Sequence, residues 1–190
     1  MKIGLDASRI NLPTGEGTYT REIIRGLVAL FPDDEFVVVI PEHDPEFDLA
    51  HVRQVIHPEG DGIVNRLRYA FEIGRIAREH KVEVFHCLTN YAAFGTSCAV
   101  VCNVMDLVTL KYPQFRPSRA QWFIYRFVFP FLLRRATYLI AISESTGRDI
   151  RDCYGFNEQI RVVHCGIDRS RFNTGQRLDT KLLERLNLPE

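Results

Sequence analysis

Two glycines stand close together where a long loop gives way to a helical pattern. Gly15 and Gly17 lie in the run Thr-Gly-Glu-Gly-Thr-Tyr of residues 14–19, after the first apolar segment. Glycine lets backbone N–H groups approach an anion closely, and the helix dipole favours negative charge at the amino end of a helix. These residues predict an anion site, although a long loop that needs glycine for its turns would show the same pattern.

Other phosphate and metal motifs are missing from the sequence. A dinucleotide-binding fingerprint would need a third glycine where Thr20 stands, and the Gly-Lys-Ser or Gly-Lys-Thr of a Walker loop does not occur. Five cysteines are present without paired ligand spacing, which favours a reduced chain over a metal site. We therefore expect no bound metal.

The elements that must position such residues follow from apolar runs that alternate with helical patterns. Runs that are apolar throughout are typical of strands buried on both faces of a parallel sheet. Six such strands are predicted, at residues 3–6, 35–40, 82–86, 99–104, 137–142 and 160–164, with a weaker candidate at residues 52–56.

Helical stripes fill most of the intervals between these strands. They predict helices over residues 19–30 and 63–77, a third from Ser118 to Ala136 with a kink or break at Pro130, and a fourth that begins at Ser143 and ends near Gly155. We therefore expect an α/β fold: a Rossmann-like, doubly wound, mainly parallel sheet with helices on both faces. Ligands of such sheets bind beyond the carboxyl ends of the strands.

Composition narrows the class of protein further. The chain has 190 residues, 46% of them hydrophobic, and its 24 Lys and Arg balance 24 Asp and Glu. This length suits one domain, and the composition excludes a disordered or fibrous chain. Zero formal charge removes a general electrostatic argument for nucleic acid. A secretory signal and a run of about 20 apolar residues are both absent, so we expect a cytoplasmic protein.

Four motifs in a fixed order resemble the family 4 (group 1) glycosyltransferases. The first combines Asp6-Ala7-x-Arg9 with the segment 14–22, and the second combines residues 84–86 with Asn90 and Tyr91. The third runs from Asp106 to Phe115, and the fourth covers residues 141–149, 160–163 and 166–172. The resemblance implies the N-terminal half of a GT-B fold, in which two Rossmann-like domains enclose a cleft.

The resemblance also implies a division of labour. Residues 1–168 would form an acceptor-side domain, and residues 169–190 would lead to a C-terminal domain that binds the nucleotide-sugar. The family's donor motif, two Glu eight residues apart, is not found here, so we expect this chain alone to be inactive. The complete protein would be a retaining, hexosyl- or related glycosyltransferase that uses a UDP- or GDP-sugar as co-substrate and acts on a glycan or lipid-linked acceptor.

Candidate site residues come from the same resemblance. The donor diphosphate would be bound by Gly15, Glu16, Gly17 and Arg9, and the acceptor by His86, Asn90, Tyr91, Asp106 and Ser143. Many relatives carry a His where this sequence has Met105, which leaves Asp106 as the only catalytic candidate. A simpler role stays open for several of them: a loop ion pair for Arg9, a buried structural role for His86, and local turns for Asn90, Tyr91 and Asp106.

Residues 107–143 contain basic and aromatic side chains and no Asp or Glu. The simpler explanation is a core helix with Arg at its ends. The alternative is a surface that binds peripherally to the anionic inner face of a membrane. That surface would be formed by Lys111, Arg116, Arg119, Trp122 and Arg126.

Two other functions stay open at this point. One is a non-catalytic half of a split transferase that binds an acceptor or a lipid. The other is the nucleotide-binding domain of an oxidoreductase, which the broken glycine fingerprint disfavours.

Overall fold

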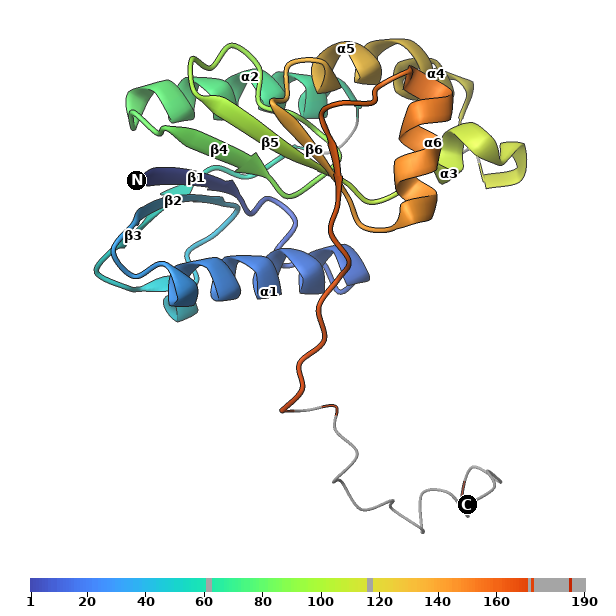
Figure 1. Ribbon diagram of the computed structural model, residues 1–190. Helices are drawn as coiled ribbons and strands as arrows, with labels where there is room; N and C mark the ends of the chain where they lie inside the picture. Colours follow the sequence, from blue (N-terminus) through green and yellow to red (C-terminus); the bar gives the residue numbers. More distant parts are fainter. Residues whose placement is uncertain (61–62, 116–117, 171, 173–184, 186–190) are drawn as a thin grey trace.

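A computed structural model describes residues 1–60, 63–115, 118–170, 172 and 185, and within them a parallel sheet of seven strands (Figure 1). The strand order is β3-β2-β1-β4-β5-β6-β7, and all neighbouring pairs are parallel. The strands are β1 (Lys2–Asp6), β2 (Glu35–Ile40), β3 (Val52–Ile56), β4 (Val84–Cys87), β5 (Ala99–Val104), β6 (Tyr138–Ala141) and β7 (Ile160–Val162). This topology confirms the predicted fold class, and the weak strand candidate at residues 52–56 is a strand.

One face of the sheet packs against helix α1 (Gly15–Leu30). Ile24 and Val28 of α1 are buried against a cluster that includes Leu5 of β1 and Phe36 of β2. Burial of one such side chain stabilises the fold by about 1.5–3 kcal/mol. The short helix η1 (Pro45–Phe47) adds Phe47 to the same cluster. This packing fixes the amino end of α1 relative to the sheet.

The other helices cover the opposite face, as Figure 1 shows. They are α2 (Ile63–Glu79), α3 (Val108–Lys111), η2 (Pro113–Phe115), α4 (Arg119–Phe123), η3 (Ile124–Val128), α5 (Phe129–Leu133) and α6 (Glu144–Tyr154). Ile73 of α2, Phe129 of α5 and Ile150 of α6 are buried there with Phe85 and Leu139 of the sheet. Helices therefore lie on both faces, unequally shared between them.

The predicted third helix differs from the one in the structure. Its helical turns run from Arg119 to Leu133 and end before Ala136, and the middle part, η3, has π-helical hydrogen bonding. Pro130 does not end the helix, which passes from η3 into α5 with right-handed helical dihedral angles at Val128 and Phe129. The π-helical turn lies on the amino side of this proline, where the missing N–H and the ring of a proline disturb the hydrogen bonds of a helix.

Both ends of α6 agree with the prediction. The Ser143 side chain accepts a hydrogen bond from the N–H of Thr146, and Gly155 closes the helix with a φ of 73°. Only glycine adopts that left-handed conformation without steric cost.

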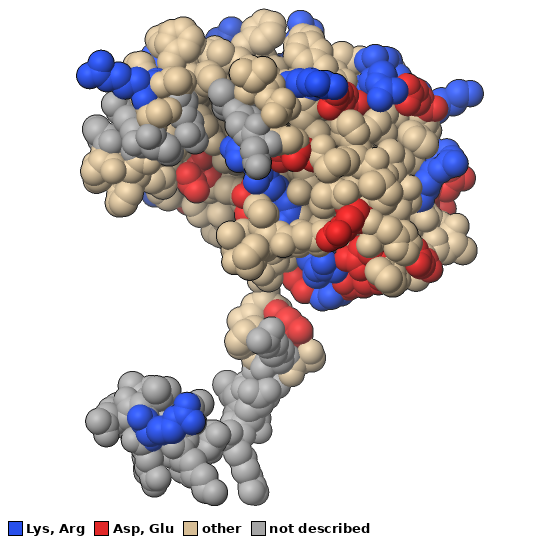
Figure 2. All heavy atoms as spheres, turned by 180° about the vertical axis from the view of Figure 1, so that it is seen from behind, with Lys and Arg blue, Asp and Glu red and all other residues tan. Residues whose placement is uncertain are grey.

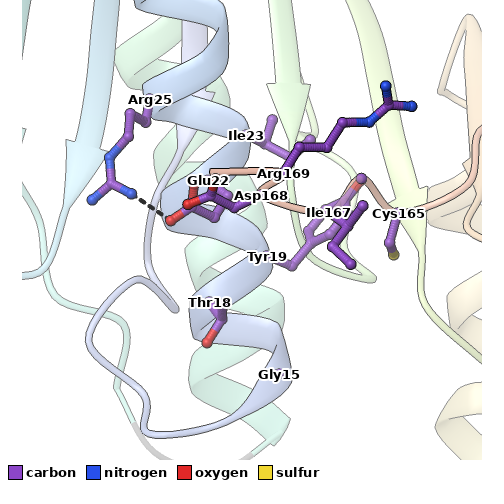
Figure 3. A pocket seen from close by; sticks show the side chains of 11 residues that line it. Gly15, Thr18, Tyr19, Glu22, Ile23, Arg25, Cys165, Ile167, Asp168 and Arg169 are labelled. Carbon is purple, nitrogen blue, oxygen red and sulfur yellow. Dashed lines mark hydrogen bonds and ion pairs between the residues drawn. The ribbon is translucent and has the colours of Figure 1, made fainter. Parts of the chain in front are cut away.

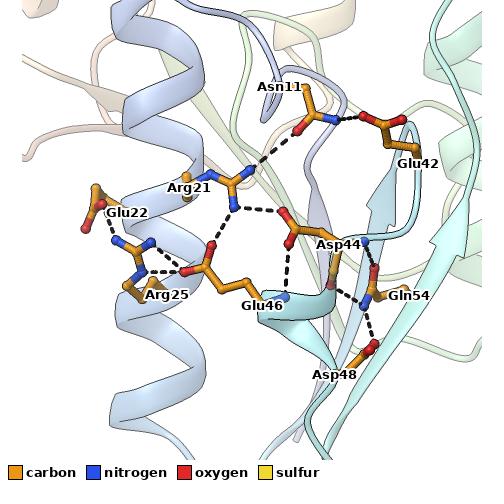
Figure 4. A network of polar contacts seen from close by, with 9 residues as sticks. All are labelled: Asn11, Arg21, Glu22, Arg25, Glu42, Asp44, Glu46, Asp48 and Gln54. Atoms are coloured by element: carbon orange, nitrogen blue, oxygen red, sulfur yellow. Dashed lines mark hydrogen bonds and ion pairs between the residues drawn. The ribbon is translucent and has the colours of Figure 1, made fainter.

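A polar network ties α1 to the connection between β2 and β3 (Figure 4). The Arg21 guanidinium donates to Asp44 Oδ2 at 2.7 Å and also pairs with Glu46. Arg25 pairs with the same Glu46, and Gln54 of β3 donates to the Asp44 carbonyl at 2.9 Å. The network holds the middle of α1 in place, and with it the wall that α1 presents to the site.

Candidate functional site

The carboxyl edge of the sheet brings together the residues that the sequence singled out. Arg9 and the glycine loop follow β1, and Asn90 and Tyr91 follow β4. Met105 and Asp106 follow β5, and Ser143 follows β6. This edge is where ligands of open parallel sheets bind, so the topology supports one shared site.

The two glycines at the start of α1 have different surroundings. A Cβ at Gly17 would lie 2.1 Å from the carbonyl oxygen of Leu12, so glycine is required there for the loop to approach the helix. The Gly17 N–H donates to Thr14 Oγ1, the N-cap, at 3.4 Å. Gly15 has no atom within 4 Å of the place of its Cβ and is exposed. The open part of the helix start is therefore at Gly15, with Glu16 half-buried beside it.

A cavity of about 820 Å³ opens beside Gly15, between α1 and the segment that follows β7 (Figure 3). In that view Tyr19 and Ile23 lie on the side of α1 that faces Ile167 and Arg169. The lining residues are Gly15, Thr18, Tyr19, Glu22, Ile23, Arg25 and residues 165–169. The cavity is large enough for a small organic ligand.

A chain of hydrogen bonds leads from this cavity into the sheet. His86 Nε2 lies 2.9 Å from Asn103 Oδ1, and Asn103 Nδ2 donates to the Tyr19 hydroxyl at 3.0 Å. With the amide in this orientation, His86 carries its proton on Nε2 and the Tyr19 O–H is left to donate to another group. Burial lowers the pKa of His86, which keeps its ring neutral. His86 is thus half-buried at the end of β4 and is linked to the cavity through Asn103 and Tyr19.

A buried carboxyl group lies at the end of β1. Asp6 is fully buried and accepts hydrogen bonds from the Tyr69 hydroxyl at 2.9 Å, the Thr89 hydroxyl at 3.2 Å and the Ser8 N–H at 3.1 Å. Burial raises the pKa of Asp6, and the three hydrogen bonds oppose that shift. Asp6 connects the ends of β1 and β4 with α2, so its role in the structure is to hold the edge together.

Arg9 takes part in an ion-pair cluster. Its Nε lies 3.2 Å from Glu59 Oε2, and Arg66 Nε of α2 lies 3.4 Å from Glu59 Oε1. Arg66 also donates to the hydroxyl of Tyr91 at 3.1 Å, and its guanidinium lies over the Tyr91 ring. The loop ion pair that the sequence left open for Arg9 is therefore present, and Tyr91 is buried in contact with Arg66.

The backbone of Met105, in the loop after β5, is held by the loop after β4 and by helix α6. The N–H of Met105 donates to Asn90 Oδ1 at 2.8 Å, and the carbonyl of Met105 accepts from Thr146 Oγ1 at 3.1 Å. Asp106 is exposed and accepts from the N–H of Val108. Asn90, Asp106 and Ser143 thus each make a local structural contact, and their contact with an acceptor stays a prediction.

Sequence reasoning missed four members of this edge: Asn103, Glu59, Arg66 and Tyr125. Asn103 left a signal, because a polar residue within a buried apolar strand must have a hydrogen-bond partner. Glu59 and Arg66 left none, because charged residues in a loop and on a helix are usually exposed to solvent. Tyr125 lies in η3, where burial, a hydrogen bond with Tyr91 and the charge of Asp106 raise its pKa, while the charge of Arg66 opposes the shift.

The predicted membrane patch is only partly a free basic surface. Lys111 pairs with Asp149, and Arg116 lies outside the described residues. Arg119 is exposed, Trp122 is half-buried, and the Arg126 guanidinium lies 5.4 Å from the ring centre of Phe127. Around them Phe123, Phe127 and Phe131 are 53–55% exposed. In Figure 2 the upper surface is largely uncharged, with blue Lys and Arg atoms scattered over it.

In the described part of the chain, none of the helices is long and apolar enough to cross a membrane. Within the same residues, no three or more His, Cys, Asp or Glu side chains form a group that could hold a metal ion.

The strand order and the open helix start define a Rossmann-like α/β domain with its site at the carboxyl edge of the sheet. The chain belongs to glycosyltransferase family 4: the family described as "Glycosyltransferase Family 4" matches residues 13–171. This match confirms the family that the four sequence motifs indicate. Comparison with curated protein sequences finds no match.

Solved structures confirm the fold. Sucrose-phosphate synthase from Thermosynechococcus elongatus aligns with a TM-score of 0.68 and 16% identity over 100% of this chain and 53% of its own. The Anabaena protein HepE, in complex with UDP-glucose, aligns with a TM-score of 0.65 and 16% identity over 98% of this chain and 50% of its own. A glycosyltransferase from Rickettsia africae aligns with a TM-score of 0.58 and 14% identity over 100% and 50%. The chain therefore spans about half the length of these proteins.

Proposed function

We propose that this chain is the acceptor-side domain of a retaining glycosyltransferase that uses a UDP- or GDP-sugar and modifies a glycan or a lipid-linked acceptor. The proposal is supported by family membership and by the Anabaena neighbour, which was solved with UDP-glucose. The observation that carries it is the exposed start of α1 at Gly15, which borders a cavity at the carboxyl edge of the sheet.

In this proposal the donor diphosphate lies against the amino end of α1. Backbone N–H groups at Gly15 and Glu16 and the helix dipole would stabilise the negative charge that develops on the leaving diphosphate. Gly17 would act indirectly, by letting residues 9–12 pack against the helix. The Tyr19 O–H, oriented by Asn103, would donate to an oxygen of the bound substrate. Arg9 would reach the diphosphate only by leaving Glu59.

A charge substitution at Gly15 tests this placement. Aspartate at the first position of a helix favours the helix through its dipole, yet it repels a diphosphate. Gly15→Asp is expected to keep or raise stability and to weaken UDP binding about fivefold or more, while Gly15→Asn keeps most of the affinity. Amide shifts in NMR titrations with UDP and GDP would report binding. Shifts that avoid residues 15–19 would contradict the proposed placement.

We further propose that a second domain completes the enzyme, with residues 169–190 leading to it. Sugar transfer is expected from this chain only after fusion to the donor-binding half of a family 4 relative, measured as release of UDP or GDP. Transfer by the 190-residue chain alone would contradict the division of labour. It would leave the family assignment unchanged.

A second proposal concerns the surface over α4, η3 and α5, which we infer to lie against an anionic membrane. Its support is the alternation of exposed Phe123, Phe127 and Phe131 with Arg126 and other basic residues. Aromatic rings suit the headgroup region of a bilayer, and arginine is attracted to anionic lipid phosphates.

Sedimentation with vesicles tests this surface. Binding to phosphatidylglycerol vesicles is expected at low salt, weaker at high salt and weaker for Phe127→Ser and Arg126→Gln. Phe31→Ser is a matched control, because Phe31 is an equally exposed aromatic residue at the end of α1. Failure to sediment at low salt, or equal binding by all four proteins, would contradict the proposal.

A further inference from the structure

The cluster of Arg9, Glu59 and Arg66 is unusual for an ion-pair network. Two guanidinium groups from different elements, the loop after β1 and helix α2, converge on one carboxylate. The side chains are largely shielded from solvent, with 16% of Arg9, 9% of Glu59 and 28% of Arg66 exposed. Such a pair of guanidinium groups matches the oxygens of a phosphate or carboxylate group.

Glu59 satisfies this pair poorly. Arg9 Nε is a buried donor without a hydrogen bond of acceptable geometry, although Glu59 Oε2 lies only 3.2 Å away. A buried donor without an acceptor is a costly feature in a folded protein. On the other side, Arg66 Nε is 3.4 Å from Glu59 Oε1, and the well-formed hydrogen bond of Arg66 runs from another nitrogen, Nη1, to the Tyr91 hydroxyl. The two arginines are therefore held in place while their donors keep unused capacity.

The position of Glu59 in the chain allows it to leave. It lies in the connection between β3 and α2 and belongs to neither element, and exposed Gly60 follows it. Burial, together with the charges of Asp6 and Glu16, raises the pKa of Glu59, while Arg9 and Arg66 lower it. Movement of the carboxylate into water would relieve that burial. Asp6 and Glu16 would also oppose a ligand anion, so its affinity must come from the two arginines.

We propose that Arg9 and Arg66 form a binding site for an oxyanion, a phosphate or carboxylate group of a ligand, and that Glu59 occupies the place of that group when the ligand is absent. The ligand group replaces the Glu59 carboxylate, accepts from Arg9 Nε and Arg66 Nε, and leaves the Arg66 bond to Tyr91 intact. Identification of the ligand as an anionic acceptor rests on the proposed function, whereas binding of an oxyanion does not.

Inorganic phosphate, with glucuronate as a carboxylate probe, tests the site on the 190-residue chain. Binding would be followed through the Nε–H resonances of the arginines in NMR titrations. Glu59→Gln is expected to bind at least one probe about tenfold more tightly, because a competing charge is removed, and Arg66→Met about tenfold more weakly, because a charge-assisted hydrogen bond is lost. A gain of affinity cannot result from misfolding. The result for Glu59→Gln therefore tests the proposed site even if Arg66→Met is unstable.

Matched controls lie on the same helix. Arg75 and Glu79 of α2 form an exposed ion pair, so Arg75→Met and Glu79→Gln repeat the two changes away from the site. Both controls are expected to bind the probes as the wild type does. Phosphate binding without glucuronate binding assigns the site to phosphate groups, and the reverse assigns it to carboxylates; either supports the proposal.

Three results would overturn it: no probe binding by wild type or Glu59→Gln, equal affinities in all variants, or loss of affinity in Glu59→Gln. UDP that shifts the Arg66 resonance as phosphate does would make this the donor site and overturn the acceptor assignment. Failure of UDP to shift residues 15–19 concerns the proposed function alone.

Discussion

Asn103 shows how a single polar side chain can organise the edge of a sheet. It is fully buried in β5, yet its amide joins His86 of β4 to Tyr19 of α1. Both partners are half-buried, and Tyr19 borders the cavity. The side chain therefore serves the stability of the sheet and the orientation of a hydroxyl at the site.

Replacement of Asn103 by leucine should lower stability. Asn103→Leu leaves His86 Nε2 and the Tyr19 hydroxyl without their partner, which costs about 1–3 kcal/mol in the free energy of unfolding. Urea denaturation at pH 7 would measure the loss, with Asn157→Leu at an exposed position as control. A change below that of the control would show that the chain of hydrogen bonds adds nothing.

The half-buried ring of His86 makes stability depend on pH. Burial lowers its pKa from the ordinary value of 6.5, so the unfolded chain binds the proton more readily than the folded one. Above pH 6.5 the ring is neutral in both states and does not lower the free energy of unfolding. As the pH falls from 6.5 toward the lowered pKa, stability is lost. His86→Gln should show a shallower decline than the wild type when the free energy of unfolding is measured between pH 7.5 and 5. Parallel curves would contradict this account.

Among the elements, both ends of α6 were predictable, whereas the start of α1 at Gly15 and the end of α5 at Leu133 differ from the predicted residues 19 and 136. Ser143 and Gly155 mark α6 because capping depends on neighbouring residues alone. The π-helical turn of η3 was not predictable, because it depends on how Trp122, Tyr125 and Phe129 fit against the core. Likewise, the sequence showed two glycines at the start of α1 but not how their surroundings differ. The place of a Cβ is occupied by a neighbouring carbonyl group at Gly17 and is empty at Gly15.

The two glycines of α1 should therefore respond in opposite ways to the same substitution. Gly17→Ala would place a methyl group against the backbone oxygens of Leu12 and Arg9 and cost about 2 kcal/mol or more. Gly15→Ala meets open space and should leave stability unchanged or raise it by up to about 1 kcal/mol. Thermal unfolding of both variants checks this contrast, and similar melting temperatures would contradict it.

At the scale of the whole molecule, the sequence predicted the parallel sheet because its strands are apolar throughout. It did not show that α1 is the main cover of one face while α2 and α4–α6 share the other. Nor did the sequence show that Arg9, Glu59 and Arg66 lie together. Their contact depends on how the loop after β1 packs against α2 and the connection between β3 and α2. The sequence thus indicated the candidate-site residues next to strand ends. It did not indicate the residues that long-range packing brings to the same edge.

The five cysteines are free, and their burial should rank their reactivity toward a thiol reagent such as DTNB. Exposed Cys165 should react first, and Cys98 and Cys153 more slowly. Cys87 and Cys102 are fully buried partners in β4 and β5, and burial raises the pKa of both thiols, so they should react only through global unfolding. Their labelling rate should rise with urea in step with the unfolding constant. Fast labelling of either thiol in native conditions would show that this sheet opens locally.

The backbone N–H and C=O of Met105 are held by Asn90, in the loop after β4, and by Thr146 of α6, and neither contact uses the methionine side chain. Backbone placement and side-chain identity are thus uncoupled at the position where the family resemblance puts a histidine. Substitution of this one residue would change the side-chain chemistry at this position and leave both backbone hydrogen bonds in place. Different side chains at this position should therefore change the stability of the fold little, and the same holds for the substitution Met105→His.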